Sequence, residues 1–179
     1  SQSLGEGWTT LKVLTLASII EKETGSPQER PQISAVFHNR LKKGMMLQTD
    51  PTIIYGLAVE KKQTIYNITR EDIHRPTPYN TYTIKGLPPG PISNPGLAAL
   101  QAAVAPADVQ SLYFVSKNDG THVFTENYTD HEAAVRKFQM DRAAREGKSW
   151  RDLSKKEESG TNDATAGTAA KTESDAVHK

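Results

Sequence analysis

Several features that decide the chemistry or the location of other proteins are missing from this 179-residue chain. It contains no cysteine, which excludes disulfides, thiolate metal sites and a cysteine nucleophile. No apolar run reaches the roughly 18 residues that a membrane span requires. Lysines and arginines number 22 against 21 acidic residues, so the basic excess with which a protein neutralises nucleic-acid phosphates is absent. The composition therefore predicts an ordinary globular domain that binds no nucleic acid.

The motifs of common cofactor sites and hydrolytic centres are also absent. There is no P-loop, no glycine-rich dinucleotide fingerprint, no Gly-x-Ser-x-Gly elbow and no His-Glu-x-x-His zinc motif. The five histidines are scattered without the spacing of metal ligands, so we expect neither a metal nor another cofactor. A Ser-His-Asp set stays open as an alternative, although nothing in the sequence favours it.

Composition divides the chain into two regions. Residues 1–153 hold the apolar and aromatic side chains that a core needs, and we predict one folded domain there. The stretch 154–179 has Val177 as its single large aliphatic residue, and we predict that it is a disordered tail because so little apolar surface cannot offset the entropy of ordering. The chain opens at Ser1 without an initiator Met or a signal segment, so we interpret it as a fragment of a longer protein.

The first part of the chain has the apolar spacing of two helices. One is expected from about residue 10 to Glu23, and the other ends at Gly44. The second helix starts near Ser26-Pro27-Gln28-Glu29, which has the pattern of a capping box, and Pro31 is expected to delay its regular part by one turn.

The remaining elements are shorter. Asp50 is expected to cap a short helix, and another helix opens at Asn94-Pro95. Six of the ten prolines fall within residues 76–95, which predicts a long loop of the kind that is usually functional in a compact domain.

A hairpin and one last helix complete the predicted fold. Residues 112–115 and 122–124 flank Asn118-Asp119-Gly120, which predicts two antiparallel strands joined by a turn. Asp130 is expected to cap a long helix that runs to about Glu146. The predicted fold class is therefore α+β, predominantly α-helical with a small β-hairpin.

The end of the first helix holds the strongest candidate for chemistry. On a helical wheel Glu23 falls between Leu16 and Ile19 on the apolar stripe, whereas Glu21 points away from that stripe. A carboxyl group against an apolar wall loses hydration, which raises its pKa, and a protonated glutamate near neutral pH can serve as a general acid. The alternative is an ordinary helix-end glutamate that bonds to the next helix N-terminus or to Lys22.

Two polar clusters further along the chain carry groups suited to a sugar. Gln48 and Thr49 offer hydrogen bonds, although a plain polar turn with Asp50 as the helix cap explains them equally. The segment Pro78-Tyr79-Asn80-Thr81-Tyr82 combines aromatic faces with an amide that both donates and accepts, as a sugar ring and its acetamido group require. A proline-rich turn with one buried tyrosine is the alternative there.

Together and in this order, these segments resemble the endolytic murein transglycosylases, the YceG-like or MltG family. The resemblance covers about residues 10–140 and is carried by spaced motifs, which are Leu16-Ala17-Ser18-Ile19-Ile20-Glu21-Lys22-Glu23-Thr24, Val36-Phe37-His38-Asn39-Arg40-Leu41, Leu47-Gln48-Thr49-Asp50-Pro51-Thr52-Ile53-Ile54-Tyr55-Gly56, Pro76-Thr77-Pro78-Tyr79-Asn80-Thr81-Tyr82, Gly86-Leu87-Pro88-Pro89-Gly90 and Leu112-Tyr113-Phe114-Val115. It implies a lysozyme-like, transglycosylase-like cleft on the helical domain.

The resemblance also implies an activity and a set of site residues. Family members cut peptidoglycan glycan strands between MurNAc and GlcNAc and leave a 1,6-anhydroMurNAc end. The second Glu of the Glu-Lys-Glu-Thr motif is their catalytic residue, and it maps onto Glu23. The remaining candidates are the substrate-binding residues Gln48, Thr49, Tyr79, Asn80 and Tyr82, with Glu21 and Asp50 in supporting roles.

The resemblance further implies where the protein works. Full-length members carry an N-terminal membrane anchor and a LysM-like subdomain, so membrane contact is expected only through a part outside this sequence. The expected location is the bacterial cell envelope, at the periplasmic or extracytoplasmic face of the inner membrane. The expected partners are glycan strands and cell-wall synthases.

One carboxyl group is enough for the implied reaction. A hydrolase generally uses two carboxylates, but here the nucleophile is the substrate's own C6 hydroxyl, whose attack is intramolecular. Glu23 then protonates the glycosidic oxygen and accepts the hydroxyl proton. Two alternatives stay open, namely a muramidase that uses water with Asp50 or Glu21 as second carboxylate, and a non-catalytic glycan-binding module of a cell-wall synthesis complex.

Overall fold

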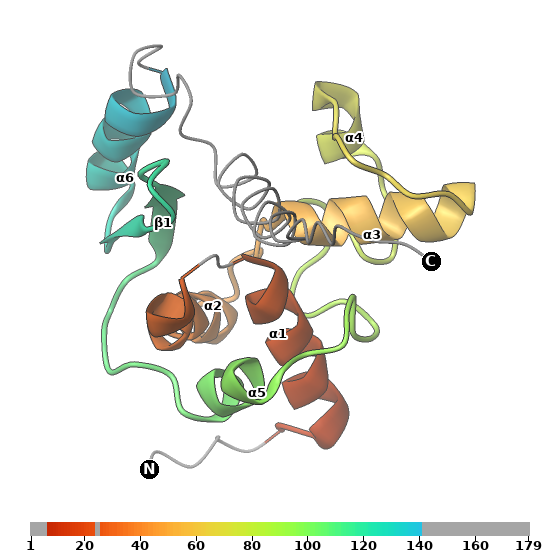
Figure 1. Cartoon of the computed structure of the whole chain (residues 1–179), viewed down its shortest axis with the longest axis horizontal. Coiled ribbons are helices and arrows are strands. Elements are labelled where there is room, and N and C mark those ends of the chain that lie inside the picture. Colours follow the sequence, from red (N-terminus) through yellow and green to blue (C-terminus); the bar gives the residue numbers. More distant parts are fainter. Residues whose placement is uncertain (1–6, 24–25, 141–179) are drawn as a thin grey trace, which may run out of the picture.

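Two successive helices and a third that lies more than fifty residues further along the chain pack side by side around the apolar core (Figure 1). In the computed structural model, which describes residues 7–23 and 26–140, they are α1 (Thr10–Glu23), α2 (Arg30–Lys42) and α5 (Leu97–Val104). Their core-facing residues recur with helical spacing and are buried, and they include Leu16, Ile19, Ile20, Ile33, Phe37, Ala99, Ala102 and Ala103. Because α5 contributes only alanines to this set, its backbone can lie close to α1 and α2.

The junction of the first two helices matches the prediction in outline. Helix α1 ends at Glu23, as expected. One 3₁₀ turn, η1 (Pro27–Glu29), precedes α2, and the α-helix begins at Arg30, so Pro31 stands in its first turn where no backbone N–H is needed.

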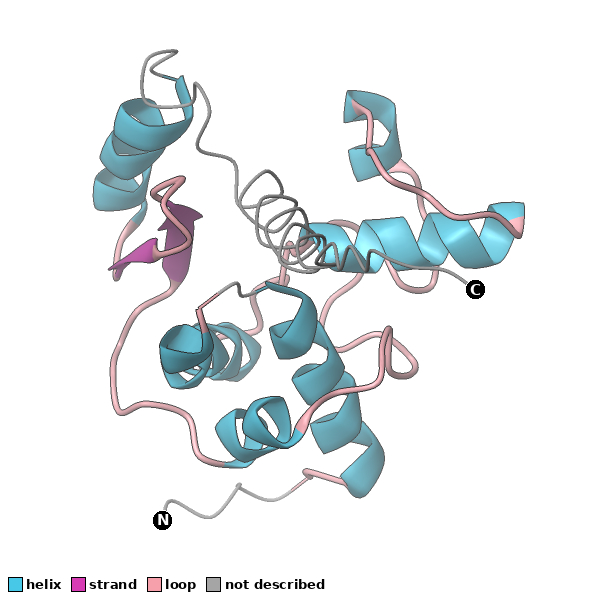
Figure 2. Ribbon diagram, viewed as in Figure 1, coloured by secondary structure: helices cyan, strands magenta, loops and turns pink. Residues whose placement is uncertain are grey.

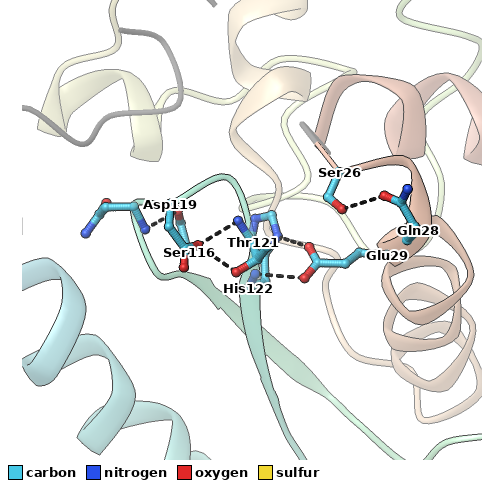
Figure 3. A network of polar contacts seen from close by, with 8 residues as sticks. Ser26, Gln28, Glu29, Ser116, Asp119, Thr121 and His122 are labelled. Carbon is cyan, nitrogen blue, oxygen red and sulfur yellow. Dashed lines mark hydrogen bonds and ion pairs between the residues drawn. The ribbon is translucent and has the colours of Figure 1, made fainter. Parts of the chain in front are cut away.

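The capping box predicted at this junction is wrong. The Ser26 hydroxyl donates to Gln28 Oε1 at 3.1 Å and makes no cap bond to the helix. The Glu29 carboxylate binds His122 on a distant strand instead of turning back to the Ser26 backbone (Figure 3). A local pattern has thus been overridden by a tertiary contact.

Helix α3 (Asp50–Lys61) lies across the end of α1 and is longer than the short helix expected. Its N-cap is Thr49, so the prediction that Asp50 caps it is wrong. A further short helix, α4 (Arg70–His74), was not predicted, and it begins with a capping box between Thr69 and Asp72.

The proline-rich segment forms a loop without helix or strand between α4 and α5, as predicted. It approaches α3 closely at Gly56, where a side-chain Cβ would lie 3.3 Å from the Cβ of Tyr79 and collide with the hydroxyl of Thr77. Glycine is therefore the residue that lets this loop pack against the helix.

The predicted hairpin is confirmed as β1 (Tyr113–Ser116) and β2 (His122–Thr125), two antiparallel strands in which Phe114 faces Phe124. The turn places Asn118 and Gly120 in the left-handed region, with φ of 63° and 87°. Figure 2 shows these strands as a small ribbon beside a helix that packs on them.

That helix, α6 (Tyr128–Val135), differs from the prediction at both ends. Its N-cap is Asn127, whose side chain accepts from the Asp130 N–H, so Asp130 is not the cap. The regular helix ends at Val135 and is followed by a π turn, η2 (Arg136–Met140). The predicted continuation to Glu146 and the predicted tail 154–179 lie outside the described residues.

Helix supplies most of the regular structure and the sheet has two strands, so the described part of the chain is α+β. Within residues 7–23 and 26–140, no helix combines the length and the apolar character needed to cross a bilayer.

Candidate active site

A cleft of about 1020 Å³ separates the helical core from the hairpin. One side is formed by the end of α1, the start of α3 and the turn that joins α2 to α3. The other side is formed by strand β1, by His122 and His131, and by Gln139. A volume of this size is typical of sites that enclose a small organic group or a few sugar rings.

Glu23, the last residue of α1, lies in this cleft with its side chain partly buried. Burial raises the pKa of the Glu23 carboxyl to about 7, and the negative charge of Asp50 acts in the same direction. A hydrogen bond from the Thr49 hydroxyl and the positive charge of Arg40 oppose this rise in pKa. The carboxyl therefore exchanges its proton near neutral pH, as a general acid and base requires.

Glu21 lies outside this cleft, although it is only two residues away on the same helix. Its Oε2 accepts from the backbone N–H of Gly96 at 3.0 Å, and its Oε1 lies 3.5 Å from an Arg30 nitrogen. The carboxylate thus joins α1 to the starts of α2 and α5. The structure does not bring this predicted supporting residue to Glu23.

Three other predicted residues do line the cleft beside Glu23, namely Gln48, Asp50 and Tyr82. The Tyr82 hydroxyl donates to Asp50 Oδ1 at 2.8 Å, and burial together with this carboxylate raises the pKa of Tyr82. Gln48 is exposed and has a φ of 52°, a left-handed conformation that is uncommon for a residue with a side chain. Strained backbone of this kind is often found at functional sites.

Thr49 and Asn80 lie behind the cleft surface. Thr49 is 2% exposed and reaches Glu23 through its hydroxyl. Asn80 is fully buried, where its amide nitrogen donates to the carbonyls of Ile73 and Arg75 and its Oδ1 accepts from the Tyr82 N–H at 2.9 Å. A direct contact between Asn80 and a sugar would require these three bonds to open, so its position is that of a support for Tyr82.

Tyr79 is half-buried and does not line the cleft itself. Its ring packs edge-to-face against Tyr55, with centroids 4.8 Å apart, and Tyr55 is the member of this pair that lines the cleft. Of the sequence candidates, Glu23, Gln48, Asp50 and Tyr82 are therefore brought together in the cleft. Thr49 and Asn80 are buried and bond to Glu23 and Tyr82, and Tyr79 contacts the cleft residue Tyr55.

Arg40 is a cleft residue that the sequence reasoning missed as a site candidate. It is 8% exposed, and its guanidinium donates to the carbonyl of Leu112 at 2.6 Å and to that of Leu47 at 2.9 Å. It also lies 5.1 Å from the ring centroid of Tyr113. Arg40 thus joins the turn that carries Gln48 to the start of the hairpin. The signal was available, since Arg40 continues the apolar spacing of Ile33, Val36 and Phe37 on α2.

The opposite wall of the cleft contains two histidines that were not candidates. His122 is held by Glu29, whose carboxylate lies 2.7 Å from its Nδ1 and accepts its backbone N–H at 3.0 Å (Figure 3). His131 stacks on Tyr113 with centroids 4.9 Å apart, and burial followed by the Arg40 charge lowers its pKa. In the described part of the chain, no three His, Asp or Glu side chains cluster closely enough to hold a metal ion.

Comparison with known proteins adds an independent line of evidence. The YceG-like family profile matches residues 2–137. The chain is 43% identical over 127 residues to an endolytic murein transglycosylase of Bacillus subtilis (strain 168), and 33% identical over 129 residues to one of Streptococcus pneumoniae serotype 2 (strain D39). Each match covers 71% of this chain, which spans 34% and 23% of the length of these relatives.

A crystal structure of a yceG-like protein from Listeria monocytogenes is also similar, with a TM-score of 0.63 at 42% sequence identity. The similarity covers 69% of this chain and 39% of that one. The residues matched by the family profile, 2–137, contain the cleft residues described above except Gln139.

Proposed function

Because this chain belongs to the YceG-like family, we propose that it cleaves peptidoglycan glycan strands as a lytic transglycosylase, with Glu23 as its general acid and base. The observation that carries the proposal is a single desolvated carboxyl, with its pKa raised to about 7, at the surface of a cleft. The names of the relatives, endolytic murein transglycosylase, support the choice of substrate.

The proposed reaction consumes no water. The Glu23 carboxyl donates its proton to the glycosidic oxygen while the bond from MurNAc C1 to that oxygen breaks. The oxygen of the substrate's C6 hydroxyl then forms a bond to C1, and the Glu23 carboxylate accepts the hydroxyl proton. The products are a strand that ends in 1,6-anhydroMurNAc and a strand that begins with GlcNAc, and Glu23 is protonated again.

The cleft residues have distinct parts in this proposal. Gln48 and Tyr82 supply polar groups at the surface, and Tyr55 supplies an aromatic face for a sugar ring. Thr49 and Asn80 act through Glu23 and Tyr82, to which they are hydrogen-bonded. The arrangement is in keeping with a lysozyme-like cleft, in which a helix-borne glutamate faces a polar wall.

The proposed setting is the cell envelope, because the relatives are named for an activity on murein. We place the catalytic domain of the protein at residues 1–153, acting at the extracytoplasmic face of the membrane. Cell-wall synthases, which produce the strands that it would cut, are the partners expected there.

A muramidase is the second candidate, and the position of Asp50 is what favours it. Asp50 lines the same cleft as Glu23 and could serve as the second carboxylate that a hydrolase needs, whereas Glu21 lies outside the cleft. The two reactions differ in their product, since hydrolysis leaves a reducing MurNAc end.

Mass spectrometry of purified glycan strands after incubation with the chain tests these proposals. We expect wild type to release fragments with 1,6-anhydroMurNAc ends and Glu23→Gln to release none. Reducing MurNAc ends would favour the muramidase. Strand binding that persists in both proteins without any cleavage would contradict an enzymatic role and favour a glycan-binding module.

A further inference from the structure

Three buried threonines lie directly behind the Glu23 carboxyl, and they bond to one another. Thr49, Thr52 and Thr81 are 2%, 0% and 0% exposed. The Thr49 N–H donates to Thr81 Oγ1 at 3.0 Å, and the Thr52 hydroxyl donates to the Thr49 carbonyl at 2.7 Å. The Thr81 N–H donates to Thr52 Oγ1 at 3.3 Å, and the hydroxyls of Thr52 and Thr81 lie 2.8 Å apart.

Counting the hydroxyl protons shows which group donates in each hydrogen bond of this cluster. Each hydroxyl has one proton to donate. Since the Thr52 proton goes to the Thr49 carbonyl, the bond between Thr52 and Thr81 must use the Thr81 proton. The backbone N–H and carbonyl of Thr49 are then both held by the cluster, while its own hydroxyl proton is directed to Glu23 Oε1.

The two oxygens of the Glu23 carboxyl are therefore unequal. Oε1 accepts from a hydroxyl whose backbone is fixed, and Oε2 has no hydrogen-bond partner among the residues that the structure describes. A proton on Oε1 would compete with the Thr49 proton for the lone pairs of that oxygen, whereas Oε2 meets no such competition. The proton of the neutral acid belongs on Oε2.

We propose that Thr49 is a positioning residue that keeps Oε1 of Glu23 occupied, so that the reacting proton is carried, delivered and recovered at Oε2. The inference rests on the proposed function. In the cleavage step Oε2 gives its proton to the glycosidic oxygen, and the same atom accepts the proton of the C6 hydroxyl, so that no proton is lost or gained.

The charged and titratable groups near Glu23 do not duplicate this role. Arg40 of α2 influences the carboxyl electrostatically, but within the described residues it forms no ion pair with it. Asp50 of α3 can accept but not donate while ionised, and Tyr82 of the loop already donates to Asp50. The remaining titratable groups that line the cleft are Lys22, Tyr55, Lys62, His122 and His131.

Titration of the Glu23 carboxyl carbon by ¹³C NMR tests the inference without any need for activity. A hydroxyl that donates to a carboxylate favours the ionised form, so Thr49→Val should raise the pKa of Glu23 by about one unit, while Thr49→Ser leaves it near the wild-type value. Thr52→Val is the matched control, because it removes a buried hydroxyl of the same cluster that does not touch Glu23. Its titration should shift much less than that of Thr49→Val, because the Thr49 hydroxyl remains and the Thr52 N–H still holds the Thr49 carbonyl. Thermal unfolding confirms that all variants are folded.

Strand-cleavage kinetics with the same variants give the second readout. We expect Thr49→Val to lower kcat about tenfold with little change in KM, and Thr49→Ser to restore most of it. An unchanged Glu23 titration in folded Thr49→Val, or an equal shift in Thr52→Val, would overturn the inference. If wild type fails to cleave strands while the titration shifts as expected, the proposed function is wrong and the Thr49 contact stands.

Discussion

Glu21 and Glu23 are two residues apart on α1, and their side chains lie in very different surroundings because they point to different sides of the helix. Glu21 has an N–H donor from Gly96 and a guanidinium from Arg30. Glu23 has one hydroxyl donor, a nearby Asp50 and a partly buried side chain, and its pKa is raised to about 7.

The difference follows from what each side of the helix faces. Glu21 meets the start of α5, where the Gly96 N–H has no acceptor within the helix and donates to the Glu21 carboxylate. Glu23 continues the apolar stripe of Leu16 and Ile19 to the cleft, where desolvation favours the neutral acid. One glutamate is thereby suited to holding helices together, and the other to transferring a proton.

The sharpest test of this comparison exchanges each glutamate for glutamine and measures strand cleavage. Glu23→Gln should lower kcat/KM by about 10²–10⁴-fold, because the proton donor is lost. Glu21→Gln should change kcat/KM by less than about threefold and should lower the free energy of unfolding by about 1 kcal/mol, since an uncharged amide is a weaker acceptor for Gly96 and Arg30. Equal losses of activity in two folded variants would show that the comparison is mistaken.

The second test measures the free energy of unfolding between pH 4 and 8. The pKa of Glu23 rises from 4.5 to about 7 on folding, so the folded state holds the proton more tightly than the unfolded chain in this window. Stability contributed by the neutral acid is therefore complete below pH 4.5 and is lost as the pH rises to 7. In denaturant titrations, the free energy of unfolding of Glu23→Gln should increase relative to that of wild type by about 2 kcal/mol across that window. This value is discounted for the partial exposure of Glu23 to water.

Glu21→Gln is the control for this second test. Because the amide at position 21 leaves the Glu23 carboxyl in place, its stability should follow the wild-type slope between pH 4.5 and 7. Parallel curves for wild type and Glu23→Gln would mean that Glu23 titrates as an ordinary exposed glutamate.

The smallest expected effect is that of Asp50 on the pKa of Glu23. The negative charge of Asp50 raises the pKa of Glu23, so Asp50→Asn should lower that pKa by about half a unit. The amide oxygen can still accept from the Tyr82 hydroxyl, which preserves the local geometry. The basic limb of the profile of kcat/KM against pH should move down by the same amount, and a limb that moves up or disappears would contradict this role for Asp50.

The features that sequence predicted well are those determined by local periodicity. The position of Glu23 on an apolar stripe and the hairpin around Asn118-Asp119-Gly120 both follow from spacing within one or two turns of chain. Local periodicity did not predict that Gln48 and Tyr82 lie beside Glu23. The residues alone identified them as candidates, and the resemblance to a family was needed to predict that they share one site.

The predictions that failed concern side chains with two competing partners. Glu29 fits a capping box but binds His122, which lies 93 residues away in sequence. Asp50 fits a helix cap, but the cap is Thr49 and Asp50 is the first residue of the helix. The Asp50 carboxylate instead accepts from the Tyr82 hydroxyl. A local rule identifies a backbone N–H donor for such a carboxylate, but it contains no information about another donor brought in by the fold.

Arg40 was missed for a different reason, which is that its partners are backbone groups. Its place on the apolar face of α2 could be read from the sequence, but its partners are the carbonyls of Leu47 and Leu112, which any residue would present. Backbone acceptors leave no trace in side-chain identity, so the turn and strand that Arg40 joins could be known only from the structure.

The left-handed backbone of Gln48 has a consequence for how this protein can change. A residue with a Cβ pays about 1 kcal/mol for such a conformation, and glycine does not. Selection for thermal robustness alone would therefore drive position 48 toward glycine, while selection for a polar group at the cleft would retain the amide. Position 48 is thus a site of trade-off between stability and function. The residue found there in a given variant indicates which of the two was under stronger selection.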